Sequence, residues 1–260
     1  MARTLTGGFR IVPRGKGCTK MRALHGLEII ENCITWPHRE DRLFFNLPPV
    51  AVQRLATITS TSSYPKRATL FVEGQVPRGV FILCSGRVKL STCSTDGRTL
   101  IMRISGPGEI LGLPATVTGK LYELTAEVIE TTQTNFIPRA DFLNFLREHS
   151  EASLRVAQQL GETYHAAVAE MRSIGLSHSA GEKLARFLLD WCANHGDGKE
   201  EIRAKLTLTH EEIAQMIGAS RETVTRLFAG FKKKQLLQIK GSTLIIRNKA
   251  ALESLLDSQD

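Results

Sequence analysis

The stretch HEEIAQMIGASRETVTRLFA, residues 210–229, decides how this chain is organised. Its pattern predicts two helices joined by a tight turn at Gly218, because glycine adopts a positive φ at little cost. Thr209 and Ser220 precede the two helices, where a hydroxyl can cap the first backbone amides. Apolar residues recur at helical spacing on the sides that would face each other: Ile213, Ile217, Val224 and Leu227. The stretch therefore predicts a packed helix-turn-helix.

The outward side of the second helix carries charged and polar groups that are unusual for a merely solvated face. In a helix-turn-helix bound to DNA, the opening turns of the second helix meet base edges in the major groove. The residues predicted to read bases are Arg221, Glu222, Thr225 and Arg226. Ser220 and Thr223 stand at the helix start, where they can hold phosphates. The alternative for this stretch alone is an ordinary packed pair of helices.

A predicted β-hairpin follows the second helix. Residues 236–239 and 244–247 alternate enough for two strands around the turn Lys240-Gly241-Ser242. Lysines before and within this hairpin can reach phosphates, namely Lys232, Lys233 and Lys240. The helix pair, its polar face and the basic hairpin together favour double-stranded DNA as a partner.

Residues 209–247 resemble the winged helix-turn-helix of the Crp/Fnr family of bacterial transcription regulators. The run Ser220-Arg221-Glu222-Thr223-Val224, followed by Arg226, is similar to the Crp-type recognition helix. The Fnr type carries a hydrophobic residue and a serine in place of Arg221 and Thr225. The resemblance implies a homodimer that reads an inverted repeat with half-sites like TGTGA, and it implies contact with RNA polymerase.

Upstream, residues 68–140 alternate short apolar runs with glycine-containing breaks. Such short runs predict an antiparallel sandwich or roll, and Asp96-Gly97 predicts a hairpin turn. The runs are Thr69–Val72, Gly79–Cys84, Arg87–Thr92, Thr99–Ile104, Glu123–Val128 and Thr134–Ile137. Ser85-Gly86 is among the predicted breaks. The order of these breaks resembles the cyclic-nucleotide-binding β-roll of the same family.

The predicted fold class is α+β, with an antiparallel β-roll joined by a long helix to the winged helix-turn-helix. Residues 1–30 are expected to be a basic, disordered tail, because they are glycine-rich and hold few large apolar groups. Residues 31–150 are expected to form the β-roll sensor domain, including a short helix that begins at Pro48-Pro49. Residues 151–176 are predicted to be the long helix, and 177–260 the DNA-binding domain.

The long helix is predicted to form the dimer interface, as its counterpart does in the family, where two copies pair in a parallel coiled coil. The seam and its flank are expected to be Val156, Leu160, Tyr164, Ala167, Met171 and Ile174. The alternative is a helix that simply packs on its own β-roll.

The resemblance also places a possible effector pocket. In the family, a glutamate within G-E-L-[GA] binds the ribose, and the arginine of R-[ST]-A binds the cyclic phosphate. The corresponding residues here are Gly112, Leu113, Leu124 and Thr125. A phosphate buried beside Leu124 would leave its charge unpaired, so we expect no control by cyclic AMP. Two cations elsewhere in the roll remain as possible substitutes, Arg103 and Lys120.

The five cysteines do not form an obvious cofactor site. The Fnr-type cluster needs C-x2-C-x5-C, whereas Cys33 is followed at those spacings by Trp36 and Arg42. Buried thiols are expected at Cys84, Cys93 and Cys192. No metal or cofactor is therefore expected. The signal is left open between an unknown small molecule, a redox event at Cys33, and no signal at all.

The composition sets the remaining bounds. The net charge of +8 suits a nucleic-acid partner, but residues 177–260 hold thirteen basic against eleven acidic residues, so DNA binding must use a local basic surface. Neither a signal peptide nor a membrane-spanning run is evident, which predicts a cytoplasmic protein. No catalytic motif suggests an enzyme. The alternatives to a DNA-binding regulator are a ligand-binding module acting on a protein partner and a redox-responsive regulator.

Overall fold

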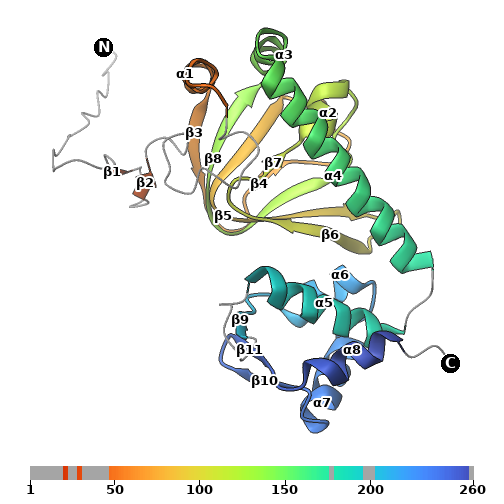
Figure 1. The fold of residues 1–260 in the computed structure, drawn as a ribbon. Helices are drawn as coiled ribbons and strands as arrows, with labels where there is room; N and C mark the ends of the chain where they lie inside the picture. Colours follow the sequence, from red (N-terminus) through yellow and green to blue (C-terminus); the bar gives the residue numbers. More distant parts are fainter. Residues whose placement is uncertain (1–19, 23–27, 31–46, 176–178, 196–202, 258–260) are drawn as a thin grey trace, which may run out of the picture. The chain divides into compact units, whose positions relative to one another are not determined.

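The computed structural model describes residues 20–22, 28–30, 47–175, 179–195 and 203–257. The chain divides into two compact units, one built on a β-roll and one on the helix-turn-helix (Figure 1). The α+β fold class predicted from the sequence is confirmed. None of the helices in the described ranges combines the length and apolarity needed to cross a bilayer.

The β-roll is a six-stranded sheet with helices before, within and after it. Its strands run in the order β3-β8-β5-β6, with β4 also pairing with β8 and β7 with β5. The strands are β3 (Ser60–Tyr64), β4 (Thr69–Phe71), β5 (Gly79–Cys93), β6 (Thr99–Ser105), β7 (Ile110–Leu111) and β8 (Thr125–Pro138). The helices are α1 (Pro49–Thr57), α2 (Leu113–Thr118), α3 (Arg139–Glu148) and α4 (Ser150–Gly175). Helix α1 begins at the predicted proline pair.

Strand β5 separates two apolar cores because successive side chains point to opposite faces of a strand. Val80, Ile82 and Cys84 belong to a core that they share with α1, α3 and the start of α4. Phe81 and Leu83 belong to a second core inside the roll. The helices therefore cover one side of the strand, and the side chains of the roll itself fill the other.

The alternation on β5 changes phase at Gly86. Before this residue the odd-numbered side chains face the interior of the roll, whereas after it Val88 and Leu90 do. Gly86 has φ of +80°, and a Cβ there would lie 2.3 Å from Thr132 Oγ1 and 2.5 Å from Thr131 O. The predicted break at Ser85-Gly86 is therefore wrong, because the glycine bends one long strand instead of ending it.

Two other strand predictions need correction. The runs Glu123–Val128 and Thr134–Ile137 are parts of the single strand β8, since the β-branched threonines between them continue the ladder. Strand β3, which pairs antiparallel with β8, is polar and was not predicted. The Asp96-Gly97 turn is confirmed, with Ser94 N donating to Arg98 O at 2.9 Å.

Part of the expected disordered tail instead forms paired strands. Residues Lys20–Arg22 (β1) and Glu28–Ile30 (β2) pair antiparallel, with Met21 opposite Ile29. The β-branched pair Ile29-Ile30 favours a strand, which the composition-based prediction overlooked. The other residues of the tail lie outside the described ranges.

The long helix is confirmed, but one side of it faces its own β-roll. Val156 is 4% exposed and packs in the helix-side core, with the half-buried Leu160 against it. Val156 therefore packs within its own unit, whereas Leu160 keeps part of its surface exposed and its place in a seam stays a prediction. Tyr164 and Ala167 are exposed, and the side chains of Met171 and Ile174 lie outside the described part of the structure.

The second unit packs four helices around a three-stranded sheet ordered β10-β11-β9. Its helices are α5 (Ala180–His195), α6 (His210–Ile217), α7 (Arg221–Lys233) and α8 (Lys249–Asp257). Its strands are β9 (Arg203–Lys205), β10 (Leu237–Lys240) and β11 (Thr243–Ile246). The hairpin β10–β11 confirms the predicted wing, whereas β9 was not predicted. Asn248 caps α8 by accepting from Ala251 N at 2.9 Å.

We predict that Gly86→Ala will destabilise the protein strongly. The new Cβ meets backbone and Thr132, and it also forces a positive φ on alanine, which together should cost about 3 kcal/mol or more of unfolding free energy. Gly97→Ala is the matched control, because Gly97 has φ of +82° but a Cβ at this position would meet nothing within 4 Å. Urea denaturation should show that the control loses only about 1 kcal/mol of unfolding free energy. Equal losses would contradict the close approach at Gly86.

Candidate nucleic-acid interface

Helix α6 begins with a complete capping box. Thr209 Oγ1 accepts from Glu212 N at 3.2 Å, and Glu212 Oε2 accepts from Thr209 N at 2.8 Å. Two amides that a helix start would leave unpaired are thus satisfied, as the sequence predicted for Thr209. The cap fixes the first residue of the helix, His210, in place.

The turn between the helices has the predicted geometry. Gly218 ends α6 with φ of +65°, and Ala219 N donates to Ala214 O at 2.9 Å. Ser220 then caps α7 by accepting from Thr223 N at 3.2 Å, and its hydroxyl lies 3.0 Å from that of Thr223. Both hydroxyls therefore gather at the amide-rich start of α7, where a phosphate can bind.

One side of α7 is fully buried and fixes the rotation of the helix. Val224 is buried as predicted, as are Ile213 and Ile217 of α6, whereas Leu227 is only half-buried. Phe228 and Phe231 complete the buried side and were missed by the sequence reasoning. Their spacing from Val224, four and seven residues on, was the signal that could have found them.

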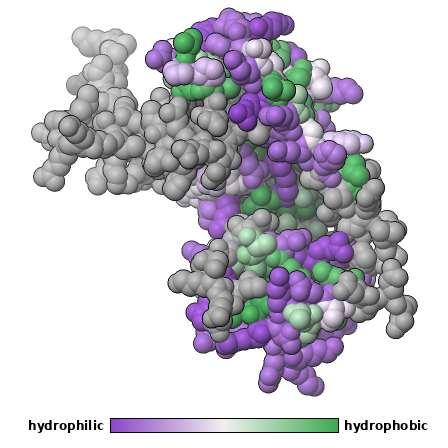
Figure 2. Space-filling view, viewed as in Figure 1, coloured by the Kyte–Doolittle hydropathy of each residue, from purple (hydrophilic) through white to green (hydrophobic). Residues whose placement is uncertain are grey.

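The opposite side of α7 presents the predicted reading set to solvent. Arg221, Glu222, Thr225 and Arg226 are all exposed. The space-filling view shows hydrophilic side chains over the part of the second unit where α7 lies (Figure 2). The structure thus brings the four side chains together on one accessible surface, as base reading requires.

The predicted phosphate-binding lysines are also exposed. Lys232 and Lys233 lie in the last turn of α7. Lys240 ends β10 at the tip of the hairpin, where Gly241 turns the chain with φ of +58°. Cations at the end of α7 and at the wing tip can therefore reach phosphates beyond those at the start of the helix.

The hydroxyl of Thr225 makes two short contacts, one of them with the helix that precedes α7. Its Oγ1 donates to Arg221 O at 2.9 Å and lies 2.9 Å from His210 Nδ1. The His210 ring stacks on Phe228 with centroids 4.9 Å apart and planes 4° apart. Partial burial, followed by the charges of Lys232 and Arg221, lowers the pKa of His210 below that of an ordinary histidine.

The four residues of the expected effector pocket do not gather into one charged site. Leu113 belongs to the helix-side core, and Leu124 packs against the core inside the roll. Gly112 starts α2 with φ of +74°, and Thr125 Oγ1 accepts from Glu73 N at 3.0 Å. The two leucines that replace the expected ligands are therefore structural.

Tyr122 fills part of the roll and was not singled out from the sequence. Its ring is 3% exposed and stacks on Phe71 with centroids 4.1 Å apart. Its hydroxyl donates to Gly79 O at 2.9 Å and accepts from Arg78 N at 3.1 Å. A large side chain with satisfied polar atoms thus occupies the interior beside Gly112.

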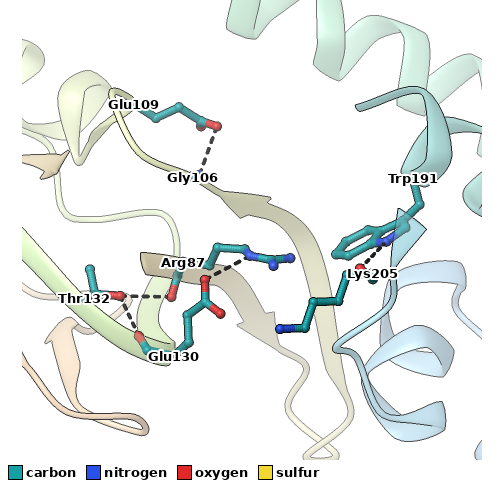
Figure 3. Close-up of polar contacts among 7 residues, drawn as sticks. All are labelled: Arg87, Gly106, Glu109, Glu130, Thr132, Trp191 and Lys205. Carbon is teal, nitrogen blue, oxygen red and sulfur yellow. Dashed lines mark hydrogen bonds and ion pairs between the residues drawn. The ribbon is translucent and has the colours of Figure 1, made fainter. Parts of the chain in front are cut away.

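Charged groups of the roll already have partners of their own. Arg87 Nε pairs with Glu130 Oε1 at 3.0 Å, and Glu109 Oε1 accepts from Gly106 N at 3.1 Å (Figure 3). Lys89 Nζ pairs with Glu127 Oε2 at 3.1 Å. Of the two suggested substitutes, Lys120 is exposed and Arg103 is half-buried on β6.

Helix α4 carries a second apolar stripe, distinct from the one against the roll. Leu154 is 61% and Tyr164 is 66% exposed, and ten residues separate them. These two residues belong to a series spaced alternately three and four residues apart, as at the a and d positions of a heptad. The series is Leu154, Ala157, Gly161, Tyr164 and Val168. This stripe is exposed or half-buried throughout.

The cysteines follow the prediction only in part. Cys192 is a buried thiol, and burial raises its pKa to about 11. Cys93 is exposed, which contradicts the prediction. Cys84 is buried in the helix-side core. Within the described ranges, no three histidine, cysteine or acidic side chains group as metal ligands would.

Comparisons with known proteins match both units. A Crp-like helix-turn-helix domain matches residues 182–255, and a cyclic nucleotide-binding domain matches residues 61–149. The CRP-like cAMP-activated global transcriptional regulator of Mycobacterium tuberculosis is 25% identical over 211 residues, 81% of this chain and 94% of that protein. The global nitrogen regulator of Synechocystis is 28% identical over 194 residues, 73% of this chain and 85% of that protein.

Solved structures show the same fold. FixK2 from Bradyrhizobium japonicum is similar with a TM-score of 0.69 at 22% identity, over 78% of this chain and 100% of that one. The CLP regulator of Xanthomonas campestris, described as c-di-GMP responsive, is similar with a TM-score of 0.67 at 16% identity. The similarity covers 76% of this chain and 99% of that one.

We predict that His210 titrates below an unfolded histidine when followed by NMR. Because the folded state favours the neutral ring, the linked stability is present above the unfolded-state pKa and is lost as the pH falls below it. Lys232→Gln removes a positive charge near the ring and should raise the pKa. A His210 pKa equal to that in urea-unfolded protein would contradict the burial and charge around this ring.

Proposed function

The chain belongs to the Crp/Fnr family of transcription regulators, and from this premise we propose that it is a homodimer that reads an inverted DNA repeat. The observation that carries the proposal is the one-sided burial of α7. Its apolar side is packed away, and Arg221, Glu222 and Arg226 are exposed together at the turns that enter a major groove. A DNA-binding regulator of this kind acts in the cytoplasm.

The exposed set has the chemistry to recognise G·C pairs. Arg221 and Arg226 each offer two parallel N–H donors to guanine O6 and N7, and Glu222 accepts from cytosine N4. By family resemblance, the half-site is expected to look like TGTGA. Ser220 and Thr223 at the helix start, with Lys232, Lys233 and Lys240, are proposed to hold the phosphates.

The second apolar stripe of α4 supports the homodimer. Isolated exposed leucine and tyrosine are common, but an a/d pattern continued over two heptads is the pattern of a coiled coil. The small residues Ala157 and Gly161 allow two helices to approach closely at the middle of the stripe. A parallel pair of α4 helices gives the two-fold symmetry that an inverted repeat requires.

The filled roll supports independence from cyclic AMP. A cyclic phosphate is usually held by a cationic side chain, and the side chains of Leu113 and Leu124 carry no charge. Arg87 and Lys89 are engaged by carboxylates. The effector, if one exists, is therefore proposed to be something other than a cyclic nucleotide. RNA polymerase is proposed as a further partner by resemblance to the family.

We predict that Arg221→Ala weakens binding to the selected operator while sparing random DNA. Loss of one arginine–guanine pair should cost about 1–3 kcal/mol per half-site. Lys233→Ala is the matched comparison, since a phosphate contact should weaken binding to all sequences and flatten the salt dependence. Gel shifts with an operator enriched from random DNA measure both. Equal loss on both DNAs for Arg221→Ala would refute base reading, and failure to enrich any motif would refute the proposed function.

We predict that Leu154→Lys converts the dimer to a monomer in sedimentation analysis, because it buries charge in the proposed seam. Glu162→Lys is the control, since Glu162 is exposed on α4 away from the stripe. The control should stay dimeric. A wild-type monomer, or a Leu154→Lys dimer of unchanged affinity, would rule out this seam.

A further inference from the structure

We propose that His210 is a specificity-determining positioning residue, which holds the hydroxyl of Thr225 so that the methyl group of Thr225 reads a thymine. This inference rests on the proposed function, because it concerns which part of α7 meets the bases. It assigns a role to a histidine outside the recognition helix, and it names the base feature that Thr225 recognises.

The hydrogen bonds of Thr225 determine which atom is the donor. A hydroxyl has one hydrogen, and here it is donated to Arg221 O at 2.9 Å, one helical turn earlier. The contact of 2.9 Å with His210 must then run the other way, with Nδ1–H donating to Oγ1. His210 is therefore the Nδ1–H tautomer. The Thr225 hydroxyl has no second hydrogen to donate to a base.

The ring of His210 is held firmly enough to act as a fixed donor. It lies flat against Phe228, which is itself 1% exposed in the core of the unit. Its backbone follows the capping box at Thr209, so the chain on that side is also fixed. The bond joins the first residue of α6 to the middle of α7, fifteen residues later.

What remains of Thr225 for a base is apolar. Thr225 is exposed, and with its hydroxyl committed to Arg221 O and His210, its methyl group is the part without a polar role. Thymine alone among the four bases carries a methyl group in the major groove, and threonine methyls contact it. The geometry therefore selects thymine at one position of the half-site by apolar contact, beside the guanines read by arginine.

The test replaces thymine by deoxyuridine, which removes only the methyl group. Full-length protein is titrated with its selected operator and with duplexes carrying this replacement at one half-site position at a time. At one position, wild type should bind the uracil duplex roughly threefold to fivefold more weakly per half-site, the effect of one buried methyl group. Thr225→Ser keeps the hydroxyl and lacks the methyl, so it should bind both duplexes equally.

His210→Ala should reduce the thymine preference at that same position while leaving affinity for random DNA unchanged. His210→Asn should restore the preference, because its side-chain amide nitrogen lies where Nδ1–H did and can donate. A role in stability alone would not change discrimination between two folded complexes that differ by one methyl group. Thermal unfolding of each variant identifies any that fail to fold, and Thr225→Ser then still decides the methyl contact.

Two results would overturn the inference. One is equal binding of thymine and uracil duplexes by wild type at every position, and the other is an unchanged preference in a folded His210→Ala variant. Either can occur while a motif is still enriched and Arg221→Ala still loses it, in which case the proposed function stands. If no motif is enriched at all, the proposed function fails first.

Discussion

The burial of Val224, Phe228 and Phe231 is the constraint on which the DNA-facing unit depends. A helix can rotate about its axis unless one side is fixed, and three buried side chains at helical spacing fix it. The charged side chains of α7 can then only face outward. Because Phe228 also supports the His210 ring, the same packing that orients the helix orients a polar group beside its reading face.

The β-roll has two apolar cores, one on each side of strand β5. Strand β5 must supply side chains to two cores at once, and the helices α1, α3 and α4 close the one outside the roll. The interior core is closed by Phe71, Tyr122 and their neighbours. The roll thus has the fold of a cyclic nucleotide-binding domain, with Leu113 and Leu124 taking part in its apolar packing.

The features that could be predicted from the sequence are those fixed within a few residues. The caps at Thr209 and Ser220, the turn at Gly218 and the outward arginines are of this kind. The errors concern choices made by distant partners. Whether Gly86 ends a strand or bends it depends on Thr131 and Thr132, and which side of α4 is free depends on where Val156 packs. The bond between His210 and Thr225 joins two helices, and no spacing rule predicts it.

The single extra residue at Gly86 divides β5 into two parts that differ in which side chains face the interior of the roll. Up to Cys84 the odd-numbered side chains face the interior, and from Val88 onward the even-numbered ones do. If the strand ran straight through Gly86 with no residue removed, plain alternation would turn Arg87 and Lys89 into the core and Val88 and Leu90 out of it. The bend at Gly86 therefore decides which side chains are buried along the arm that ends at the Asp96-Gly97 turn.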